Sequence, residues 1–371
     1  MRDKLAERLL AQVMGWSAED VARERPDLQA MAAHKYDEYQ QFSPGMRFVE
    51  SLAGWLDNFE TVEERHVAYD FTKRRLIFIS EAEMRHLITV AYPDIIRPIL
   101  LREAASLLSI RDYEVTKIAS SREFQLLCRK SLFLGLSDGA RIDYFRRVVS
   151  GLSNEQVHVD YRIEDKTAED LRIKLRQDVQ ALTTGSEDDV EAAFEMVFLL
   201  NDFSASADTL LRKEDDKPMG KLVRAMESIV GLQHQEPPLV SREGAKVFVV
   251  LYIATETAIQ NLLQRIPELR SASWPDCEVR RVCILRNDIK VSPENDPKFH
   301  EMLVKYYDPQ IMDSHLRKGG TDVICGYAEC ALPVVLAHNT PNNSVYLLWA
   351  NKPRLRTKAL FPRVSRHRED V

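Results

Sequence analysis

An apolar run that ends in an amide, an acid and a loop of small residues has the residue types needed to bind a sugar phosphate. Residues 196–200 (MVFLL) are followed by Asn201 and Asp202, and then by small residues at 204–207. Such a run is typical of a strand buried on both faces of a parallel sheet, and ligands of these sheets bind outside the carboxyl ends of the strands. A helix that we expect to open at Thr209 would leave backbone N–H groups for a phosphate, while Asp202 would accept hydrogen bonds from sugar hydroxyls. A strand followed by a capped helix, without a ligand, explains the same pattern.

The elements that would position this stretch are predicted from the spacing of apolar residues. Residues 1–115 show helical spacing, and the stripe Phe48, Leu52, Trp55, Leu56 and Phe59 is expected to be core. Farther along, strands are expected at 131–136, 157–161, 196–200, 246–254 and 279–285, helices at 167–182, 222–230 and 256–265, and loops at 211–218 and 233–244. This alternation predicts right-handed β–α–β units and a parallel sheet flanked by helices.

Three parts are therefore expected: an N-terminal helical region at 1–115, an α/β core at 116–315 and a C-terminal extension at 316–371. The extension has strand-like runs at 323–327, 333–337 and 345–349, an Asn-rich turn and a basic tail. The tail, residues 352–368, holds seven Lys or Arg residues, which either form a solvated surface or contact phosphates of a nucleic acid or nucleotide.

Composition points to a cytoplasmic globular protein. The 371 residues are 45% hydrophobic and 29% charged, and the net charge of −6 gives no overall attraction for nucleic acid. The longest apolar run, residues 247–254, is too short to span a bilayer, and the first residues lack the apolar centre of a secretion signal. Five cysteines without a framework spacing suggest reduced thiols. Cys325 and Cys330 have no second pair nearby, so small core residues are expected there rather than a metal site.

Residues 198–209 resemble the loop of type I phosphoribosyltransferases that binds phosphoribosyl diphosphate (PRPP), in which two acids precede a Thr-Gly-x-Thr sequence. Together with Ser137–Arg141, residues 252–258, His338-Asn-Thr-Pro-Asn-Asn343 and Phe361-Pro-Arg363, this loop makes the chain resemble the PRTase-CE family. The resemblance covers roughly residues 75–365. It implies a type I phosphoribosyltransferase core and a role in bacterial conflict and anti-phage systems, with a defence-system protein or a nucleic acid as a further partner.

The resemblance also implies roles for individual residues in binding PRPP or a nucleotide. Asn201 and Asp202 would hold the ribose hydroxyls. The 5-phosphate would be held by Ser204, Ala205, Ser206, Ala207, Asp208 and Thr209, and the pyrophosphate by Ser137, Asp138, Gly139, Ala140 and Arg141. Magnesium would bind through substrate phosphates and water, with few protein ligands. An ordinary turn is the alternative for residues 137–140.

The loop departs from the family's pattern at Asn201, at Ala207 and at Ser206, which takes the place of a threonine. Asn201 stands for the first acid and cannot make the stronger hydrogen bonds of an ionised acceptor. Ala207 stands for the glycine, and at positive φ it would cost about 1–2 kcal/mol. Ala205 removes another position for glycine, so the loop is stiff for a phosphate cradle. We therefore expect ligand binding rather than efficient turnover, and a catalytically weakened nucleotide sensor, or an effector or scaffold subunit of a defence complex, is the alternative to an enzyme.

Other polar residues have two interpretations each. Asn339, Asn342 and Asn343 would either hold a tight turn or face the base of the substrate. Glu256, at the head of a helix after a strong strand, is a candidate for the base side of the site. His338 would act as a general acid or, as is more usual for a lone histidine beside an apolar strand, have a structural role.

Overall fold

The computed structural model describes residues 3–183, 191–351 and 357–364 and divides into two compact units. The sheet unit comprises residues 85–286, and the terminal unit comprises residues 1–84 and 287–371. This division differs from the expected boundaries after residues 115 and 315. The reason is a long-range pairing: β1 (Ile77–Ile79) and β9 (Val334–Leu336) form a parallel pair, which joins the two ends of the chain in one unit.

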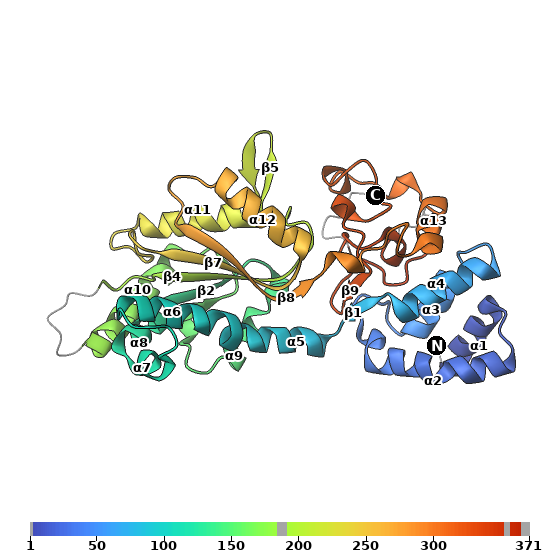
Figure 1. Cartoon of the computed structure of the whole chain (residues 1–371), viewed down its shortest axis with the longest axis horizontal. Helices are drawn as coiled ribbons and strands as arrows, with labels where there is room; N and C mark the ends of the chain where they lie inside the picture. The colour runs from blue at the N-terminus through green and yellow to red at the C-terminus, as the bar shows by residue number, and fades with distance from the viewer. Residues whose placement is uncertain (1–2, 184–190, 352–356, 365–371) are drawn as a thin grey trace. The chain divides into compact units, whose positions relative to one another are not determined.

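The sheet unit is built on a five-stranded sheet in the order β3-β2-β4-β7-β8 (Figure 1). Its strands are β2 (Ser131–Gly135), β3 (Val157–His158), β4 (Met196–Ser204), β7 (Lys246–Thr255) and β8 (Asp276–Leu285). All four pairings are parallel, which confirms the predicted α/β fold with a parallel sheet flanked by helices. β4 lies at the centre, and its residues 196–200 are all buried, as an uninterrupted apolar run predicts.

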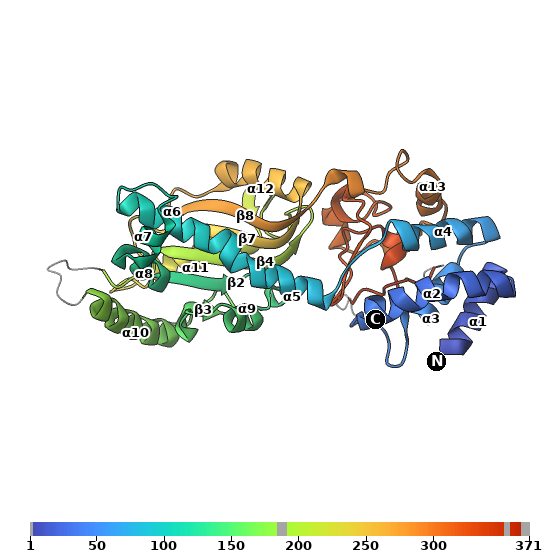
Figure 2. The ribbon, with the colours of Figure 1, turned by 60° about the horizontal axis from the view of Figure 1, so that its bottom comes forward.

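Side chains of β4 alternate between the two faces of the sheet because successive residues of a strand point in opposite directions. Val197 and Leu199 belong to the core formed with α10 (Asp165–Thr183), α11 (Lys221–Gln233) and α12 (Glu256–Leu269). On the opposite face, the Phe198 ring stacks between those of Phe133 and Phe248, at centroid distances of 5.1 and 5.3 Å. Helices α6 (Arg97–Leu107) and α9 (Ile142–Val148) lie on this second side (Figures 1 and 2).

The segment after β4 differs from the expected helix at Thr209 and loop at 211–218. A single turn, with the N–H groups of Leu210 and Leu211 donating to Ala207 O, is followed by the hairpin β5 (Arg212–Glu214) and β6 (Lys217–Met219). Asp215 and Asp216 form its tip with φ of 50° and 60°, the conformation that two-residue hairpin turns require. Helix α11 starts only at Lys221, so no helix N-terminus follows the loop directly.

The terminal unit contains five helices in its described residues that are longer than eight residues, together with the β1–β9 pair. They are α1 (Asp3–Met14), α2 (Ala18–His34), α3 (Phe48–Leu56), α4 (Val62–Arg74) and α13 (Pro297–Lys305). The predicted stripe on and after α3 is fully buried, and Trp55 Nε1 donates to Leu347 O at 2.9 Å. The strands expected at 323–327 and 345–349 are absent from these described residues. Tyr346–Leu348 forms a 3₁₀ turn instead.

Helix α5 (Glu81–Val90) continues through a π-helical segment at Ala91–Ile96, which contains Pro93, into α6. A proline removes one helical donor, so a widened turn at this point is expected. No helix in the described residues is both long and apolar enough to cross a membrane.

Candidate functional site

The carboxyl ends of β2 and β4 bring two of the predicted segments together. These strands pair in register, with Gly135 opposite Leu200, so the residues that follow them meet at one edge of the sheet. The Ser137 hydroxyl lies within donor distance of both Asn201 Oδ1, at 3.1 Å, and Asp202 Oδ1, at 2.9 Å. The segment expected to meet pyrophosphate is therefore in direct contact with the segment expected to hold ribose.

Asn201 uses both ends of its amide inside the protein. The residue is 3% exposed, its Nδ2 donates to Phe203 O at 2.9 Å, and its Oδ1 faces the Ser137 hydroxyl. Oδ1 keeps a second lone pair and Nδ2 a second hydrogen, but a residue that is 3% exposed offers little surface for contact with a ribose hydroxyl. Asp202, which is half-buried, is the better placed of the two for such a contact.

The loop after β4 is buried but leaves several backbone donors without an acceptor. Ser204, Ala205, Ser206 and Ala207 are 3–7% exposed. Within the described part of the chain, the backbone N–H groups of Ser206, Ala207 and Thr209 donate to no protein acceptor, whereas that of Asp208 donates to Ser206 Oγ at 3.3 Å. Buried backbone N–H groups are nearly always hydrogen-bonded. The two adjacent free donors at the buried Ser206 and Ala207, with a third at the exposed Thr209, therefore favour an anionic ligand.

Ala207 adopts the left-handed conformation that the family's glycine suggests. Its φ is 69°, which an L-residue adopts at a cost of about 1–2 kcal/mol. The glycine-like backbone is thus retained although the glycine is not.

Side chains of α12 fix the other side of this loop. Thr255, the N-cap residue of α12, donates to Ala205 O at 2.6 Å and accepts from the N–H of Ala258 at 3.0 Å. Asn261 Nδ2 donates to Ser206 O at 2.9 Å. Arg265 Nη1 donates to Asp208 Oδ1 at 2.6 Å and to Leu211 O at 2.9 Å.

These three residues were not anticipated from the sequence. The pattern of α12 shows its apolar face, where Ala258, Leu262 and Ile266 are buried, but it does not say what the polar residues beside that face contact. Thr255 alone carried a signal, because a threonine before a helical pattern is a typical N-cap.

The segment at 137–141 forms a tight 3₁₀ turn ahead of α9. Asp138 is exposed and Arg141 is half-buried with φ of 46°. Ala140 is buried, and its carbonyl accepts from the hydroxyl of the fully buried Tyr252 at 3.0 Å. Burial raises the pKa of Tyr252, and the negative charge of Asp202 raises it further. Tyr252 therefore stays a neutral donor that anchors this turn.

Glu256 lies at the start of α12, directly after the Thr255 that bonds to the loop. It is half-buried and belongs to the same edge of the sheet. Its assignment to the base side of the site stays a prediction.

Asparagines 339, 342 and 343 belong to the terminal unit, and both interpretations of their side chains stay predictions. Asn339 Oδ1 accepts from the N–H of Thr340 at 3.0 Å. Asn342 O accepts from the N–H of Tyr327 at 2.7 Å, and Asn343 Nδ2 donates to Tyr327 O at 3.1 Å. The carbonyl of His338 accepts from Gln41 Nε2 at 2.8 Å.

Most of the basic tail lies outside the described residues, namely 352–356 and 365–368. Of its described residues, Arg363 lies over the Trp349 ring at 5.9 Å.

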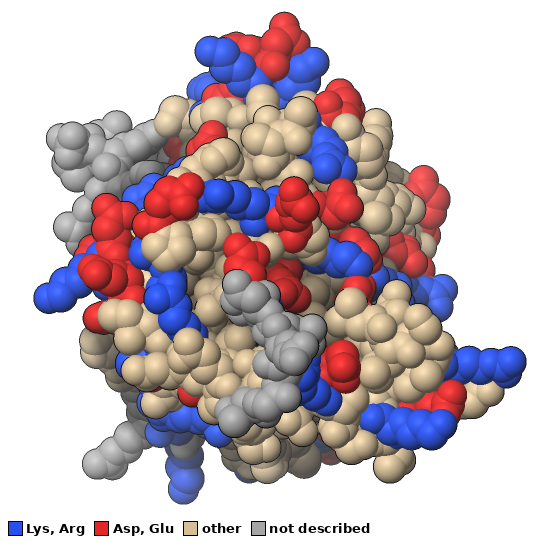
Figure 3. Space-filling view, turned by 90° about the vertical axis from the view of Figure 1, so that its left-hand side faces the viewer, with Lys and Arg blue, Asp and Glu red and all other residues tan. Residues whose placement is uncertain are grey.

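Lys and Arg side chains are interspersed with Asp and Glu on the face shown in Figure 3, so this face presents no extended basic surface.

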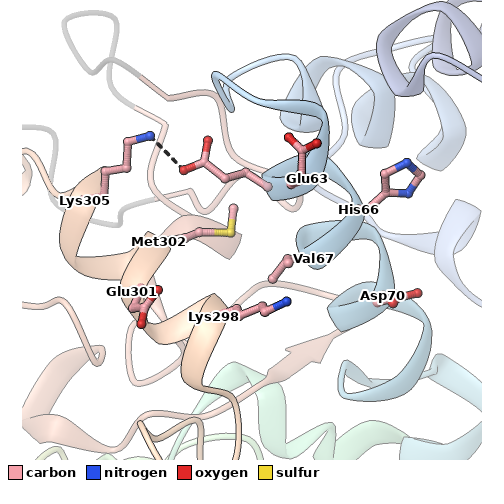
Figure 4. A pocket seen from close by; sticks show the side chains of 9 residues that line it. Glu63, His66, Val67, Asp70, Lys298, Glu301, Met302 and Lys305 are labelled. Atoms are coloured by element: carbon pink, nitrogen blue, oxygen red, sulfur yellow. Dashed lines mark hydrogen bonds and ion pairs between the residues drawn. The ribbon is translucent and has the colours of Figure 1, made fainter.

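A cleft of about 630 Å³ lies in the terminal unit between α4 and α13 (Figure 4). Val67 and Met302 supply apolar side chains, and charges of both signs surround them; Lys305 pairs with Glu64 at 2.8 Å. None of the residues predicted to bind a ligand lines it. The described residues contain no group of three or more His, Cys, Asp or Glu side chains suited to a metal ion.

Comparison with known proteins places the chain in a family. No curated protein and no solved structure matches it. The profile of the PRTase-CE family matches residues 52–363, which is most of the chain and includes the sheet, the loop after β4 and the Asn-rich turn. The chain therefore belongs to the PRTase-CE family and is a phosphoribosyltransferase-like protein.

Proposed function

We propose that the sheet unit binds PRPP or a nucleotide at the carboxyl ends of β2 and β4. The observation that carries this proposal is the set of free backbone N–H groups at Ser206, Ala207 and Thr209, which follows Asp202 within a few residues. Free N–H groups in one short loop suit the oxygens of a phosphate, and a carboxylate suits vicinal hydroxyls. A 5-phosphorylated ribose carries both groups at neighbouring positions.

Each part of the ligand then has a protein partner. The loop would hold the 5-phosphate, and Asp202 would accept from the ribose hydroxyls while the Ser137 hydroxyl fixes its carboxylate. The turn at 137–141 would meet the pyrophosphate, with the always charged Arg141 guanidinium opposite the phosphate oxygens. Magnesium, when bound, would screen the charge of the diphosphate. Because Mg²⁺ prefers substrate phosphates and water as ligands, it would need few ligands from the protein.

As an enzyme, the protein would transfer the phosphoribosyl group to an acceptor base. A bond from the base to the anomeric carbon of the ribose would form as the bond from that carbon to pyrophosphate breaks, and pyrophosphate would leave. Two residues would make this turnover inefficient. The side-chain amide of Asn201 is already hydrogen-bonded inside the protein, and the backbone of Ala207 is strained at φ of 69°. These two features favour the second candidate, a nucleotide sensor or an effector or scaffold subunit that binds the ligand without rapid turnover. In both cases we infer a role in bacterial anti-phage defence, which is supported by membership of the PRTase-CE family.

Isothermal titration calorimetry with PRPP and Mg²⁺, and with ribose 5-phosphate alone, tests the binding site. We expect both ligands to bind and Asp202→Ala to weaken both. Asp170→Ala, which removes an exposed acid of α10, is the matched control and should bind like the wild type. Absence of binding in the wild type would overturn the proposal.

Pyrophosphate release from PRPP in the presence of candidate bases then separates the two functions. Release by the wild type that is lost in Asp202→Ala identifies an enzyme. Binding without release, in the wild type and in Ala207→Gly alike, identifies the sensor or scaffold.

A further inference from the structure

We propose that Asn261 and Arg265 of α12 are positioning residues of the loop, which hold its N–H groups in the orientation that a phosphate needs. This inference rests on the proposed function for its effect on binding. Neither residue is expected to touch the ligand, and both act through the loop.

Covalent geometry links the bonds on one side of the loop to the free donors on the other. In a trans peptide the C=O of one residue and the N–H of the next point in opposite directions, and the peptide bonds of this loop are trans. Thr255 holds the carbonyl of Ala205, so the N–H of Ser206 points away from Thr255. Asn261 holds the carbonyl of Ser206, so the N–H of Ala207 points away from Asn261.

The same relationship extends to Thr209. Arg212 Nη1 lies 3.4 Å from Asp208 O, and the N–H of Thr209 belongs to that peptide. The three free donors, at Ser206, Ala207 and Thr209, are therefore placed back to back with carbonyls that side chains hold. The bonds to α12 and to Arg212 account for the orientation of the N–H groups without any ligand.

Arg265 has a second effect, which is electrostatic. Asp208 lies within the proposed phosphate loop, where a free carboxylate would repel a phosphate. Arg265 pairs with it at 2.6 Å, and both side chains are largely buried: that of Asp208 is 17% exposed and that of Arg265 is 27% exposed. Pairing neutralises the carboxylate and holds it toward α12, and the bond from Arg265 to Leu211 O extends the hold to the end of the turn.

Asn261 and Arg265 lie four residues apart, on one face of the helix. Gln260 and Gln264 are their immediate neighbours and are exposed on α12. The variants Gln260→Ala and Gln264→Ala therefore serve as matched controls for Asn261→Ala and Arg265→Ala, since they change the same helix without changing the loop.

Hydrogen–deuterium exchange of the ligand-free full chain tests the positioning itself. We expect peptides that cover residues 203–211 to exchange about threefold faster or more in Asn261→Ala and Arg265→Ala, since loss of a local contact lowers the free energy of local opening. The two glutamine variants should exchange like the wild type. Equal exchange in all five proteins would overturn the inference.

Titration with ribose 5-phosphate tests the consequence for binding. We expect Asn261→Ala and Arg265→Ala to raise Kd by roughly tenfold, the size of one weakened charge-assisted hydrogen bond. The double variant Arg265→Ala/Asp208→Asn should recover part of this loss, because it removes the carboxylate that Arg265 neutralises. A purely structural role of Arg265 predicts no recovery, and that result would overturn the electrostatic part.

The two experiments separate the inference from the proposed function. If the wild type binds no ribose 5-phosphate, the proposed function is overturned, whereas the exchange rates still decide whether α12 holds the loop. If the wild type binds and the α12 variants bind equally well, the positioning role is overturned and the proposed function stands.

Discussion

Gly139 lies directly against the carboxylate of Asp202, so closely that a Cβ atom at position 139 would overlap it. The turn that follows β2 and the last residues of β4 thus meet without space for one methyl group. The contact explains why a glycine stands at this position, although its backbone is not in the left-handed region.

Replacing Gly139 by alanine should therefore displace Asp202. We expect Gly139→Ala to weaken binding of ribose 5-phosphate by roughly tenfold or more, the effect of losing a charge-assisted hydrogen bond, measured by calorimetry. Gly231→Ala is the control, because a Cβ at this position of α11 would meet nothing within 4 Å. That variant should bind normally and be slightly more stable, as alanine is the better helix former.

Ala207→Gly should stabilise the protein. Glycine removes a strain of about 1–2 kcal/mol at φ of 69° and costs about 0.5–1 kcal/mol of backbone entropy, so we expect a net gain of about 0.5–1 kcal/mol. Urea-induced unfolding measures this difference. Ala205→Gly, at a position without positive φ, should instead destabilise, and a gain of the same size in both variants would contradict the strain argument.

Restoring an acid at position 201 should not simply restore the family's site. Asn201→Asp replaces the donor to Phe203 O by an oxygen, which leaves two acceptors facing each other in a buried place. We expect a loss of about 1–3 kcal/mol in the free energy of unfolding, the cost of an unsatisfied buried polar group. An unchanged or higher stability in urea would mean that Asn201 has no such structural role.

Phe361 should be among the most sensitive residues of the terminal unit. Its ring is fully buried and lies within 6 Å, centroid to centroid, of five others: Tyr36, Tyr39, Phe42, Phe48 and Phe78. Phe361→Ala should cost about 3–5 kcal/mol, measured by denaturant unfolding. Val364→Ala, three residues on and 53% exposed, should change stability by less than about 0.5 kcal/mol.

His158 should make stability depend on pH on the acid side. Burial lowers its pKa from 6.5, although the Glu155 carbonyl 2.8 Å from Nε2 opposes this shift. The contribution of His158 is therefore complete above the pKa of the unfolded chain and is lost as pH falls through the lower folded value. The free energy of unfolding should fall less between pH 7.5 and 5 in His158→Gln than in the wild type, and equal losses would refute the assignment.

The sequence predicted the sheet well because its strands are runs that only a buried strand accommodates, such as residues 196–200 and 246–254. It failed after β4 for a local reason. Thr209, Leu210 and Leu211 resemble the start of a helix, but the left-handed Ala207 and the Asp215–Asp216 turn lead the chain into a hairpin.

Other features escaped prediction because they depend on long-range contacts. The strand-like run at 333–337 is visible in the sequence, but nothing in it indicates that Val334–Leu336 pairs with Ile77–Ile79. The bonds of Asn261 and Arg265 likewise require knowledge of which backbone carbonyls lie beside α12. The departure of Asn201 from the family's acid is visible in the sequence, but its internal partners, Ser137 and Phe203, are known only from the structure.

The terminal unit contains residues 1–84 and 287–371, so its two parts are synthesised at different times and it cannot fold before the sheet unit has been synthesised. All of residues 85–286 emerge before the segment that contains Leu347, whose carbonyl Trp55 bonds across 292 residues of sequence. Domains form as units while synthesis proceeds, so the sheet unit can complete itself while the N-terminal helices still lack the aromatic centre around Phe361. Those helices must therefore wait, with apolar surface uncovered, until the segment around Phe361 has been synthesised.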